Sequence, residues 1–282
     1  MPSAAAPVSV ARPNQPDDTT GADAAAIAGK HVHFVGIGGC GMSGLARIAQ
    51  SLDAHCTGSD RTDSDTIARL REAGIDVALS QSADTVPGDC DMLVISAAIK
   101  DDHPEVVEAR RRGVRVVKYA KLLGQLMIGR TGVAIAGTHG KSSTTSMLSH
   151  ILIECGLDPS FIVGANCTQI GGGSRVGKGD ALIAEACEFD RSFHNLHPTH
   201  AVILNIEADH LDMYSGLDEI VESFAEFARR LPGESAGGYL LIHHESPHRL
   251  PLTASLDCKV ESIGFAPQAD WCVEVAPATA RA

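Results

Sequence analysis

The distribution of apolar residues along the chain predicts alternating strands and helices. Short apolar runs typical of buried strands are separated by segments with apolar positions at helical spacing. The strand-like runs are residues 31–37, 92–97, 114–117, 133–136, 181–186, 201–206 and 239–242. The helical patterns are residues 42–52, 65–73, 104–112, 144–155 and 218–230. This alternation predicts an α/β fold whose mainly parallel sheets are covered by helices on both faces.

A further helix, predicted at residues 121–127, separates two sets of these elements. A chain of 282 residues is long enough for two ordinary domains. We therefore expect a Rossmann-like domain at 30–129 and a second α/β domain at 130–282, with the helix at 121–127 as the hinge and the boundary near Gly129. Residues 1–29 are rich in Ala, Pro, Asp and Thr and lack a basic n-region, so they predict a disordered tail rather than a signal peptide.

Composition narrows the classes of partner. The chain has 23 Lys and Arg against 35 Asp and Glu, a formal charge of −12, and its densest basic run is only residues 110–112. Nucleic acid is therefore not an expected partner. No run approaches the roughly 20 apolar residues of a membrane span, so no membrane partner is expected either. The eight cysteines are scattered without a C-x-x-C pair, which favours reduced thiols and a cytoplasmic protein.

A candidate phosphate-binding loop follows the apolar run 133–136. Backbone N–H groups and the N-terminus of the next helix suit phosphate oxygens, Lys141 suits the β- and γ-phosphates, and the Ser142 hydroxyl suits Mg²⁺. The strict motif requires glycine where Ile135 stands, and the plain alternative is a polar helix start capped by serine. The predicted ATP-binding residues are Gly137, Thr138, His139, Gly140, Lys141, Ser142 and Ser143.

A second glycine loop, of the pattern G-x-G-x-x-G, follows the first strand-like run. Gly36 would permit the tight turn, Gly38 close approach of a diphosphate, and Gly41 close packing of helix on strand. Asp60 follows at about the distance at which an acidic residue meets a ribose hydroxyl. The loop predicts a nucleotide-diphosphate site, with a glycine packing turn as the alternative.

Acidic residues and a histidine follow two strand-like runs of the second half, in Glu185-Ala-Cys-Glu-Phe-Asp and Glu207-Ala-Asp-His-Leu-Asp. Because the carboxyl ends of parallel strands share one sheet edge, these residues should lie beside the phosphate loop. Glu185 offers the oxygen ligand that Mg²⁺ prefers, whereas His210 is a less usual ligand for so hard an ion. The alternative is solvated acids and helix caps, with Asp218 as a cap.

Five motifs occur in an order that resembles the Mur ligases, from about Lys30 to the end of the chain. They are Gly36-Ile-Gly-Gly-Cys-Gly-Met-Ser-Gly, Ser96-Ala-Ala-Ile, Gly137-Thr-His-Gly-Lys-Ser, Glu185-Ala-Cys-Glu-Phe-Asp with Ser192-Phe, and Asn205-Ile-Glu-Ala-Asp-His-Leu-Asp-Met-Tyr. The resemblance implies ATP-dependent amide formation in peptidoglycan precursor synthesis, with an acyl-phosphate intermediate and with UDP-N-acetylmuramate and L-alanine as substrates.

The same resemblance implies residue roles. Lys141, Glu185 and His210 would be catalytic, and ATP would bind with two Mg²⁺ ions held by Ser142, Glu185 and His210. The implied sugar-nucleotide residues are Gly36, Gly38, Gly39, Gly41, Met42, Asp60 and Ser96.

The chain departs from the family pattern at Cys187, Phe189 and Ser80-Gln81, where the family usually has Asp, Ser and Gly-His. It also stops before the adenine-contacting segment and the third domain of the family, so we expect an incomplete central domain, weak catalysis and exposed apolar surface that promotes self-association. Three alternatives stay open: a recycling ligase that attaches a peptide to UDP-muramate, a non-catalytic nucleotide-binding fragment, and an NAD-dependent oxidoreductase.

Overall fold

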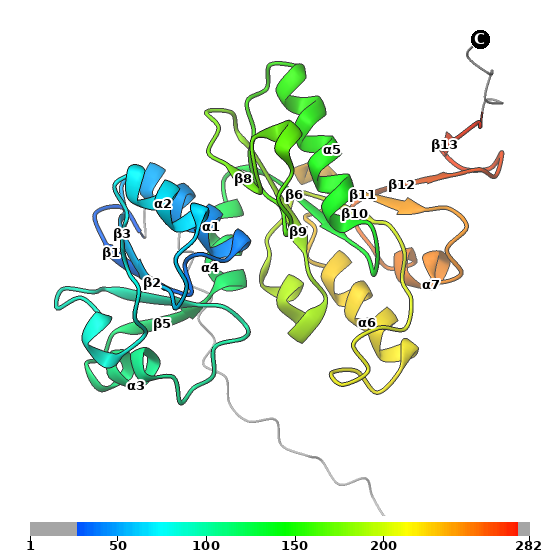
Figure 1. The fold of residues 1–282 in the computed structure, drawn as a ribbon. Helices are drawn as coiled ribbons and strands as arrows, with labels where there is room; N and C mark the ends of the chain where they lie inside the picture. Colours follow the sequence, from blue (N-terminus) through cyan, green and yellow to red (C-terminus); the bar gives the residue numbers. More distant parts are fainter. Residues whose placement is uncertain (1–26, 276–282) are drawn as a thin grey trace, which may run out of the picture.

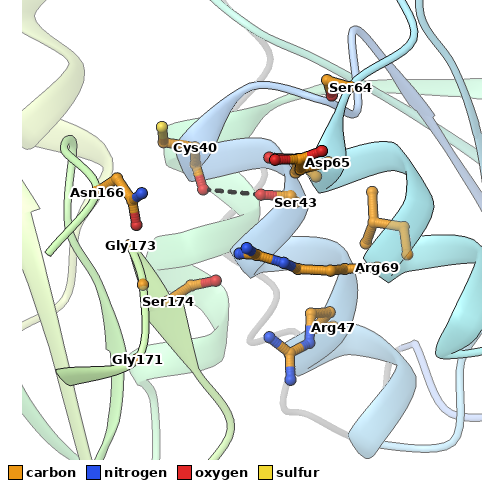
Figure 2. A pocket seen from close by; sticks show the side chains of 13 residues that line it. Cys40, Ser43, Arg47, Ser64, Asp65, Arg69, Asn166, Gly171, Gly173 and Ser174 are labelled. Carbon is orange, nitrogen blue, oxygen red and sulfur yellow. Dashed lines mark hydrogen bonds between the residues drawn. The ribbon is translucent and has the colours of Figure 1, made fainter. Parts of the chain in front are cut away.

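A computed structural model describes residues 27–275 of the chain. It contains two α/β units, each built on one sheet, that lie side by side with α4 between them (Figure 1). This arrangement confirms the α/β class predicted from the sequence. Within the described residues, no helix combines the length and the apolar character needed to cross a membrane.

The first sheet has five parallel strands in the order β3-β2-β1-β4-β5. The order reverses between β1 and β4, which is where open α/β sheets bind ligands. The elements of this unit are β1 (His31–Val35), α1 (Cys40–Ser51), β2 (His55–Ser59), α2 (Asp65–Glu72), β3 (Asp76–Ala78), η2 (Ala83–Thr85), β4 (Met92–Ile95), α3 (Pro104–Arg111), β5 (Arg115–Lys118) and α4 (Tyr119–Met127).

The second sheet has eight strands in the order β13-β12-β11-β10-β6-β9-β7-β8, all parallel except β8 against β7. Central strands β6 and β9 are nearly all apolar because both of their faces are covered. The elements are β6 (Thr131–Ala136), α5 (Lys141–Glu154), β7 (Ser160–Ile162), η3 (Thr168–Ile170), β8 (Ser174–Arg175), β9 (Ala181–Ala186), η4 (Phe189–Asn195), β10 (His200–Ile203), α6 (Leu217–Ala228), η5 (Glu234–Ala236), β11 (Tyr239–His243), α7 (Arg249–Thr253), β12 (Lys259–Gly264) and β13 (Trp271–Cys272).

The predicted elements are all present, with shifted ends. Helix α5 begins at Lys141, three residues before the predicted start, because its first turn is polar. Strand β10 ends at Ile203, which leaves residues 204–206 in the loop that follows. Strands β2, β3, β7, β8, β12 and β13 are not among the predicted apolar runs, since most are only two or three residues long and β2 and β12 are rich in polar residues.

Helix α4 joins the two units as a packed element. Four of its side chains, Leu122, Leu123, Leu126 and Met127, are at most 2 % exposed and belong to a core that contains residues of both sheets. An ideal Cβ at Gly124 would lie 1.9 Å from the Asn195 carbonyl oxygen of η4. The helix that the sequence predicted as a hinge is therefore fixed against the second unit by this close approach.

The predicted tail at 1–29 lies mostly outside the described residues, but its last part is ordered. Ile27 is 2 % exposed and packs in the core, and the Gly29 N–H donates to the Asp53 carbonyl oxygen at 2.7 Å. Residues 27–29, which the sequence assigned to the tail, therefore pack against the first unit. One apolar side chain among alanines and glycines gave no periodic signal in the sequence.

His194 stacks on Phe193 with ring centroids 4.8 Å apart and donates from Nε2 to the Ser223 carbonyl oxygen at 2.8 Å. Desolvation lowers the pKa of His194 below its ordinary value of 6.5, and Arg230 and Arg191 add to this effect against the Ser223 hydrogen bond and Glu226. The unfolded chain therefore binds a proton at a higher pH than the folded chain does.

We expect the free energy of unfolding to fall as the pH is lowered through about 6.5, since the unfolded state then gains protons that the folded state does not bind. The His194→Gln variant should lose part of this decrease, measured by urea unfolding at pH values above and below that point. His150→Gln, at an exposed position on α5, is the matched control. An unchanged pH slope in the His194 variant would contradict the assignment.

Candidate functional site

The glycine loop after β6 leads directly into α5, as the sequence predicts. Gly137 and Gly140 have φ angles of +144° and +85°, a region that side chains other than glycine rarely adopt. Gly140 is the N-cap of α5, which places Lys141, Ser142 and Ser143 in its first turn with their N–H groups outside the helical ladder. The positive end of the helix dipole adds to these donors, so the loop has the geometry of a phosphate site.

Asn205, which follows β10, clamps the outer part of this loop. Its side-chain oxygen accepts the His139 N–H at 2.7 Å, and its Nδ2 donates to the His139 carbonyl oxygen at 3.0 Å. Its own carbonyl oxygen accepts the Thr138 N–H at 3.1 Å. The Thr138 and His139 amides, predicted to face ATP, are therefore engaged within the protein. The backbone N–H groups that can still donate to a phosphate are therefore those of Gly140 and of the residues that follow it.

Lys141 turns back into the loop and meets a buried carboxylate. Its Nζ donates to the Gly137 carbonyl oxygen at 2.6 Å and to the two Glu188 carboxylate oxygens at 2.9 and 3.1 Å. The Glu188 side chain is 3 % exposed and that of Lys141 is 16 % exposed. A bound phosphate would compete with Glu188 for this ammonium group.

Glu188 also faces His210 from the next loop. His210 Nε2 lies 3.8 Å from a Glu188 carboxylate oxygen and 3.8 Å from Asp209 Oδ2, and ligand atoms of all three residues lie within 4.8 Å of one another. The two carboxylates suit Mg²⁺, and the imidazole is a less usual addition. The ring of Phe189 meets that of His210 edge-on at 5.3 Å.

Three residues around this cluster hold left-handed backbone conformations without being glycine. The φ angles are +52° at Asp190, +49° at Arg191 and +51° at His210. Such conformations cost free energy and persist where the surroundings fix them, often at functional sites. One contact that fixes the backbone here is a hydrogen bond from the buried Tyr214 hydroxyl, which donates to the Glu188 carbonyl oxygen at 2.5 Å.

Glu185 does not belong to this cluster in the described structure. Its Oε1 accepts the Gly164 N–H at 2.6 Å, and an ideal Cβ at Gly164 would lie 2.9 Å from Oε2. The predicted role of Glu185 at a metal stays a prediction. The sequence assigned Glu188 no role, because only the fold shows that Glu188, after β9, and not Glu185, within β9, points toward Lys141.

In the first unit, Asp60 fastens the glycine loop. One carboxylate oxygen accepts the Gly38 N–H at 2.9 Å, and the other accepts the N–H groups of Arg61 and Thr62 at 2.7 and 3.1 Å. An ideal Cβ at Gly38 would lie 2.8 Å from Asp60 Oδ2. Gly38 is thus required by Asp60 itself, whatever ligand approaches the loop.

Two other predicted residues serve packing. Met42 is 5 % exposed and its side chain lies in the core, so only its backbone faces the loop region. An ideal Cβ at Gly41 would lie 3.0–3.2 Å from the Tyr119 ring of α4, so the close neighbour is a helix and not the predicted strand. Gly36, at φ +72°, makes the predicted turn, and Gly39 is exposed beside it.

A cavity of about 420 Å³ opens at the carboxyl edge of this sheet, where β2 and β4 end. It is lined by Asp60, Arg61, Gln81, Ala98, Ile99, Lys100, Asp102, His103 and Pro104. Ser96 is half-buried at the end of β4 and accepts the Ile99 N–H through its carbonyl oxygen. The cavity stands where doubly wound sheets bind nucleotides.

Two family descriptions match the chain, and they divide at the same place as the sheets. "Mur ligase family, catalytic domain" matches residues 31–131, and "Mur ligase middle domain" matches residues 135–279. The chain belongs to the Mur ligase family. The five motifs quoted from the sequence lie on the two glycine loops, directly after β4, at the end of β9 and after β10.

Relatives of this Mur ligase chain include the UDP-N-acetylmuramate--L-alanine ligases of Sorangium cellulosum and Methylibium petroleiphilum. The first is 43 % identical over 86 % of this chain and 51 % of its own length, and the second is 44 % identical over 84 % and 50 %. The chain thus spans about half the length of the curated relatives it matches.

Two solved structures share the Mur ligase fold at 27 % identity. The UDP-N-acetylmuramate-alanine ligase of Thermotoga maritima has a TM-score of 0.72, covering 87 % of this chain and 54 % of its own. The UDP-N-acetylmuramate:L-alanyl-gamma-D-glutamyl-meso-diaminopimelate ligase of Neisseria meningitides has a TM-score of 0.78, covering 88 % and 82 %.

Proposed function

We propose that this chain carries the sugar-nucleotide and ATP sites of a ligase that joins L-alanine to UDP-N-acetylmuramate, a step of peptidoglycan precursor synthesis. The proposal rests mainly on the position of Lys141, which lies at the start of α5 and faces the cluster of Glu188, Asp209 and His210. Hydrogen-bond donors for phosphate oxygens and oxygen ligands for a divalent ion meet at one sheet edge, which is the arrangement that phosphoryl transfer requires.

In the proposed reaction, a carboxylate oxygen of the muramoyl group forms a bond to the γ-phosphorus of ATP as the bond to the β,γ-bridging oxygen breaks. ADP leaves and an acyl phosphate results. The amine of L-alanine then attacks the acyl carbon, inorganic phosphate leaves, and the amine loses a proton. Lys141 and the N–H groups of α5 would stabilise negative charge on the transferring phosphoryl group.

Mg²⁺ would be held by Ser142, Glu185 and His210, as the family resemblance implies, with Glu188 and Asp209 added from the described contacts. When bound, the ion neutralises phosphate charge and orients the phosphates. The ion pair between Lys141 and Glu188 keeps the lysine beside the loop until phosphate replaces the carboxylate as its partner.

For the first unit we propose binding of the UDP group, with the diphosphate at Gly36, Gly38, Gly39 and Gly41 and the rest of the nucleotide toward the 420 Å³ cavity. The Asp60 carboxylate already accepts three N–H groups, so it has less capacity for the ribose hydroxyl that a dinucleotide site would offer it. This observation favours a UDP-sugar over NAD.

A recycling ligase that attaches a peptide is the second candidate, because one structural neighbour with that activity in its name has the TM-score of 0.78. The curated relatives at 43 and 44 % identity carry the alanine name, whereas both structural neighbours are only 27 % identical. Sequence similarity therefore favours L-alanine as the amine substrate.

We also propose a cytoplasmic location, supported by eight cysteines that are all free in the described residues. Self-association is a further proposal, supported by large apolar side chains on the surface of α5 and near β13. Met147 and Ile151 are 65 % and 54 % exposed, and Trp271 and Phe265 are 58 % and 63 % exposed.

Titration calorimetry and mass spectrometry test the function. We expect UDP-N-acetylmuramate to bind the chain more tightly than NADH does, and we expect MgATP to bind it as well. Incubation with both nucleotides and L-alanine tests whether the chain forms UDP-N-acetylmuramoyl-L-alanine. Tighter binding of NADH would refute the UDP-sugar assignment, and ligation of a tripeptide in preference to L-alanine would favour the recycling activity.

The roles of Glu185, within β9, and Glu188, after β9, can be separated by their magnesium dependence. We expect Glu188→Gln to weaken MgATP binding, because the change removes a carboxylate beside His210 and Lys141. The family resemblance predicts a loss at least as large for Glu185→Gln. Calorimetric titration of ATP at several Mg²⁺ concentrations measures both, with Glu207→Gln as an exposed control. If Glu185→Gln had no effect, Glu185 would be a loop-fixing residue for Gly164 only.

A further inference from the structure

Helix α5 directs small polar side chains toward its own sheet and large apolar side chains away from it. Thr145 and Ser149, one turn apart, are fully buried, and the Ser149 hydroxyl has no hydrogen-bond partner within residues 27–275. Met147 and Ile151, also one turn apart, are 65 % and 54 % exposed. At 3.6 residues per turn the two pairs lie on nearly opposite sides of the helix. Apolar side chains grouped on the outer side of a helix are typical of a surface that a partner covers.

The sheet beside α5 is fully covered on only one of its faces. On the face that packs against α6, four side chains of β10 and β11 are at most 1 % exposed: Ala201, Ile203, Leu240 and Ile242. Val202 and Leu241 alternate with these residues and are only half-buried, on the side where α5 lies. Figure 1 shows α5 and α6 on opposite sides of this sheet. Because parallel sheets normally have both faces covered, the cover of β10 and β11 is incomplete on the α5 side within the described residues.

A groove of about 460 Å³ lies along this incompletely covered face, and we call it the α5 groove. Leu148 and Leu152 of α5 line one side of it, and Val202, Tyr239 and Leu241 line it from the sheet. The groove lies toward the amino ends of the strands, whereas the phosphate loop lies at their carboxyl ends. The ligase function proposed above uses none of these side chains.

The acidic groups beside the α5 groove already have partners. Asp180, in its lining, accepts two hydrogen bonds from the first residue of β6. Glu261 of β12 accepts from the Tyr239 hydroxyl, from Trp271 Nε1 and from the Lys259 ammonium group, each at 2.6 Å. Burial of these two carboxylates would therefore leave neither without a donor. Tyr and Trp side chains of this kind are enriched at the centres of protein interfaces.

The groove lies next to a ridge, so this face is complementary to itself. The α5 ridge is the exposed pair Met147 and Ile151. A twofold axis would place the ridge of each copy in the groove of the other, since residues that meet across such an axis do so twice. The two α5 helices would then form one layer between two sheets, which is how α/β sheets pack against their own helices.

The α5 face is large enough for a specific but weak dimer. The 14 residues of α5 measure about 21 Å at 1.5 Å per residue. A helix about 10 Å wide and three strand spacings of about 4.8 Å, from β10 to β13, give a width of about 24 Å. Two such faces together cover on the order of 1,000 Å², which is the lower limit of a specific interface.

We propose that two copies of this chain associate through the α5 face, with the α5 ridge of each copy seated in the α5 groove of the other. The proposal rests on the self-association proposed above, for which it names the face and the partner, and it does not depend on the ligase reaction. Lys141 begins α5, whereas the ridge lies in its later turns and the groove at the amino ends of the strands. The phosphate loop therefore stays accessible in the dimer.

Sedimentation velocity of the 282-residue chain over a concentration series measures the association. We expect the wild type to shift from monomer toward dimer as its concentration rises. Ile151→Lys should raise the dissociation constant at least about tenfold, because a charged group must then enter an apolar groove. Leu250→Lys is the matched control, since Leu250 is an apolar residue of α7 that is 67 % exposed outside the α5 face, and it should leave the constant unchanged.

A mixture of two defective variants tests the twofold arrangement. Leu241→Asp places a carboxylate in the groove, so it should also weaken association of the chain with itself at least about tenfold. Mixed with Ile151→Lys, it should form a heterodimer, because one contact then joins lysine with aspartate and the other joins the two native side chains. A mixture that associates no better than either variant alone would overturn the arrangement. Thermal unfolding verifies each fold, and if Leu241→Asp does not fold, the exposed Ile151→Lys variant alone decides.

Salt dependence and nucleotide binding complete the test. Added salt should strengthen the dimer, because it screens the repulsion between two chains of formal charge −12 and leaves the apolar contact in place. A wild type that stays monomeric at about 200 μM would overturn the proposal. Association that Ile151→Lys leaves unchanged would overturn this face while leaving self-association itself in place. Ile151→Lys should bind MgATP as wild type does, so a failure of the dimer and a failure of the nucleotide site are distinguishable.

Discussion

Replacement of Lys141 by methionine is expected to destabilise the chain by about 3–5 kcal/mol, the usual cost of leaving one member of a buried ion pair without its partner. Glu188 is 3 % exposed on its side chain and receives two hydrogen bonds from Lys141 Nζ. Without the lysine, the basic side chain that stays beside the Glu188 carboxylate within residues 27–275 is His210, at 3.8 Å. Urea unfolding of wild type and variant measures the difference.

The same variant is expected to lose measurable MgATP binding, because the cation at the phosphate loop is gone. Adding Glu188→Gln should restore most of the stability, since no uncompensated charge remains, without restoring ATP binding. This second variant separates the structural role of Lys141 from its ligand role. Lys178→Met, at an exposed position, is the control. Wild-type ATP affinity in the Lys141 variant would show that the phosphate site lies elsewhere.

Replacement of Gly124 by alanine is expected to destabilise the chain by up to about 2 kcal/mol, against the direction that helix propensity predicts. Alanine is favoured over glycine inside a helix by about 1 kcal/mol. The added methyl group would stand 1.9 Å from the Asn195 carbonyl oxygen and 3.1 Å from the Leu196 Cα, and this backbone must move aside. Overpacking of this kind costs about 1–3 kcal/mol and sometimes more, which outweighs the gain.

Chemical unfolding followed by circular dichroism measures this effect. Because α4 packs against η4 at Gly124, the added methyl group should weaken the coupling between the two units. The denaturant concentrations at which the two units unfold should therefore lie further apart in the variant than in wild type. Gly88→Ala is the matched control, since its added Cβ meets no atom within 4 Å. A stabilised Gly124→Ala variant would mean that α4 does not hold this close contact in solution.

The sequence alone determined the features that depend on local order along the chain. The apolar runs of β6 and β9 identify buried strands because both faces of each strand are covered. The glycines at 36, 137 and 140 identify turns because only glycine adopts their backbone angles without strain. The Mur ligase family could also be identified from the sequence, because each of its motifs is a short contiguous segment and the motifs follow one another in a fixed order.

Only the tertiary structure decided which side chains meet. Glu185 and Glu188 are three residues apart, and the turn after β9 brings Glu188 to Lys141 while Glu185 bonds Gly164. No local pattern distinguishes these two neighbouring acids, because their partners, Lys141 of α5 and Gly164 after β7, come from distant segments of the chain. The Asn205 clamp on His139 joins residues 66 positions apart and was missed for that reason.

The same limit applies to the first unit and to the contact between units. Asp60 had the position of a ribose ligand, yet the folded loop directs its carboxylate to backbone N–H groups. Gly41 faces Tyr119 and Gly44 faces Ser174, contacts that form only when α4 and β8 pack beside α1. Residue spacing fixes the type of element, whereas the choice of partner depends on where distant elements pack.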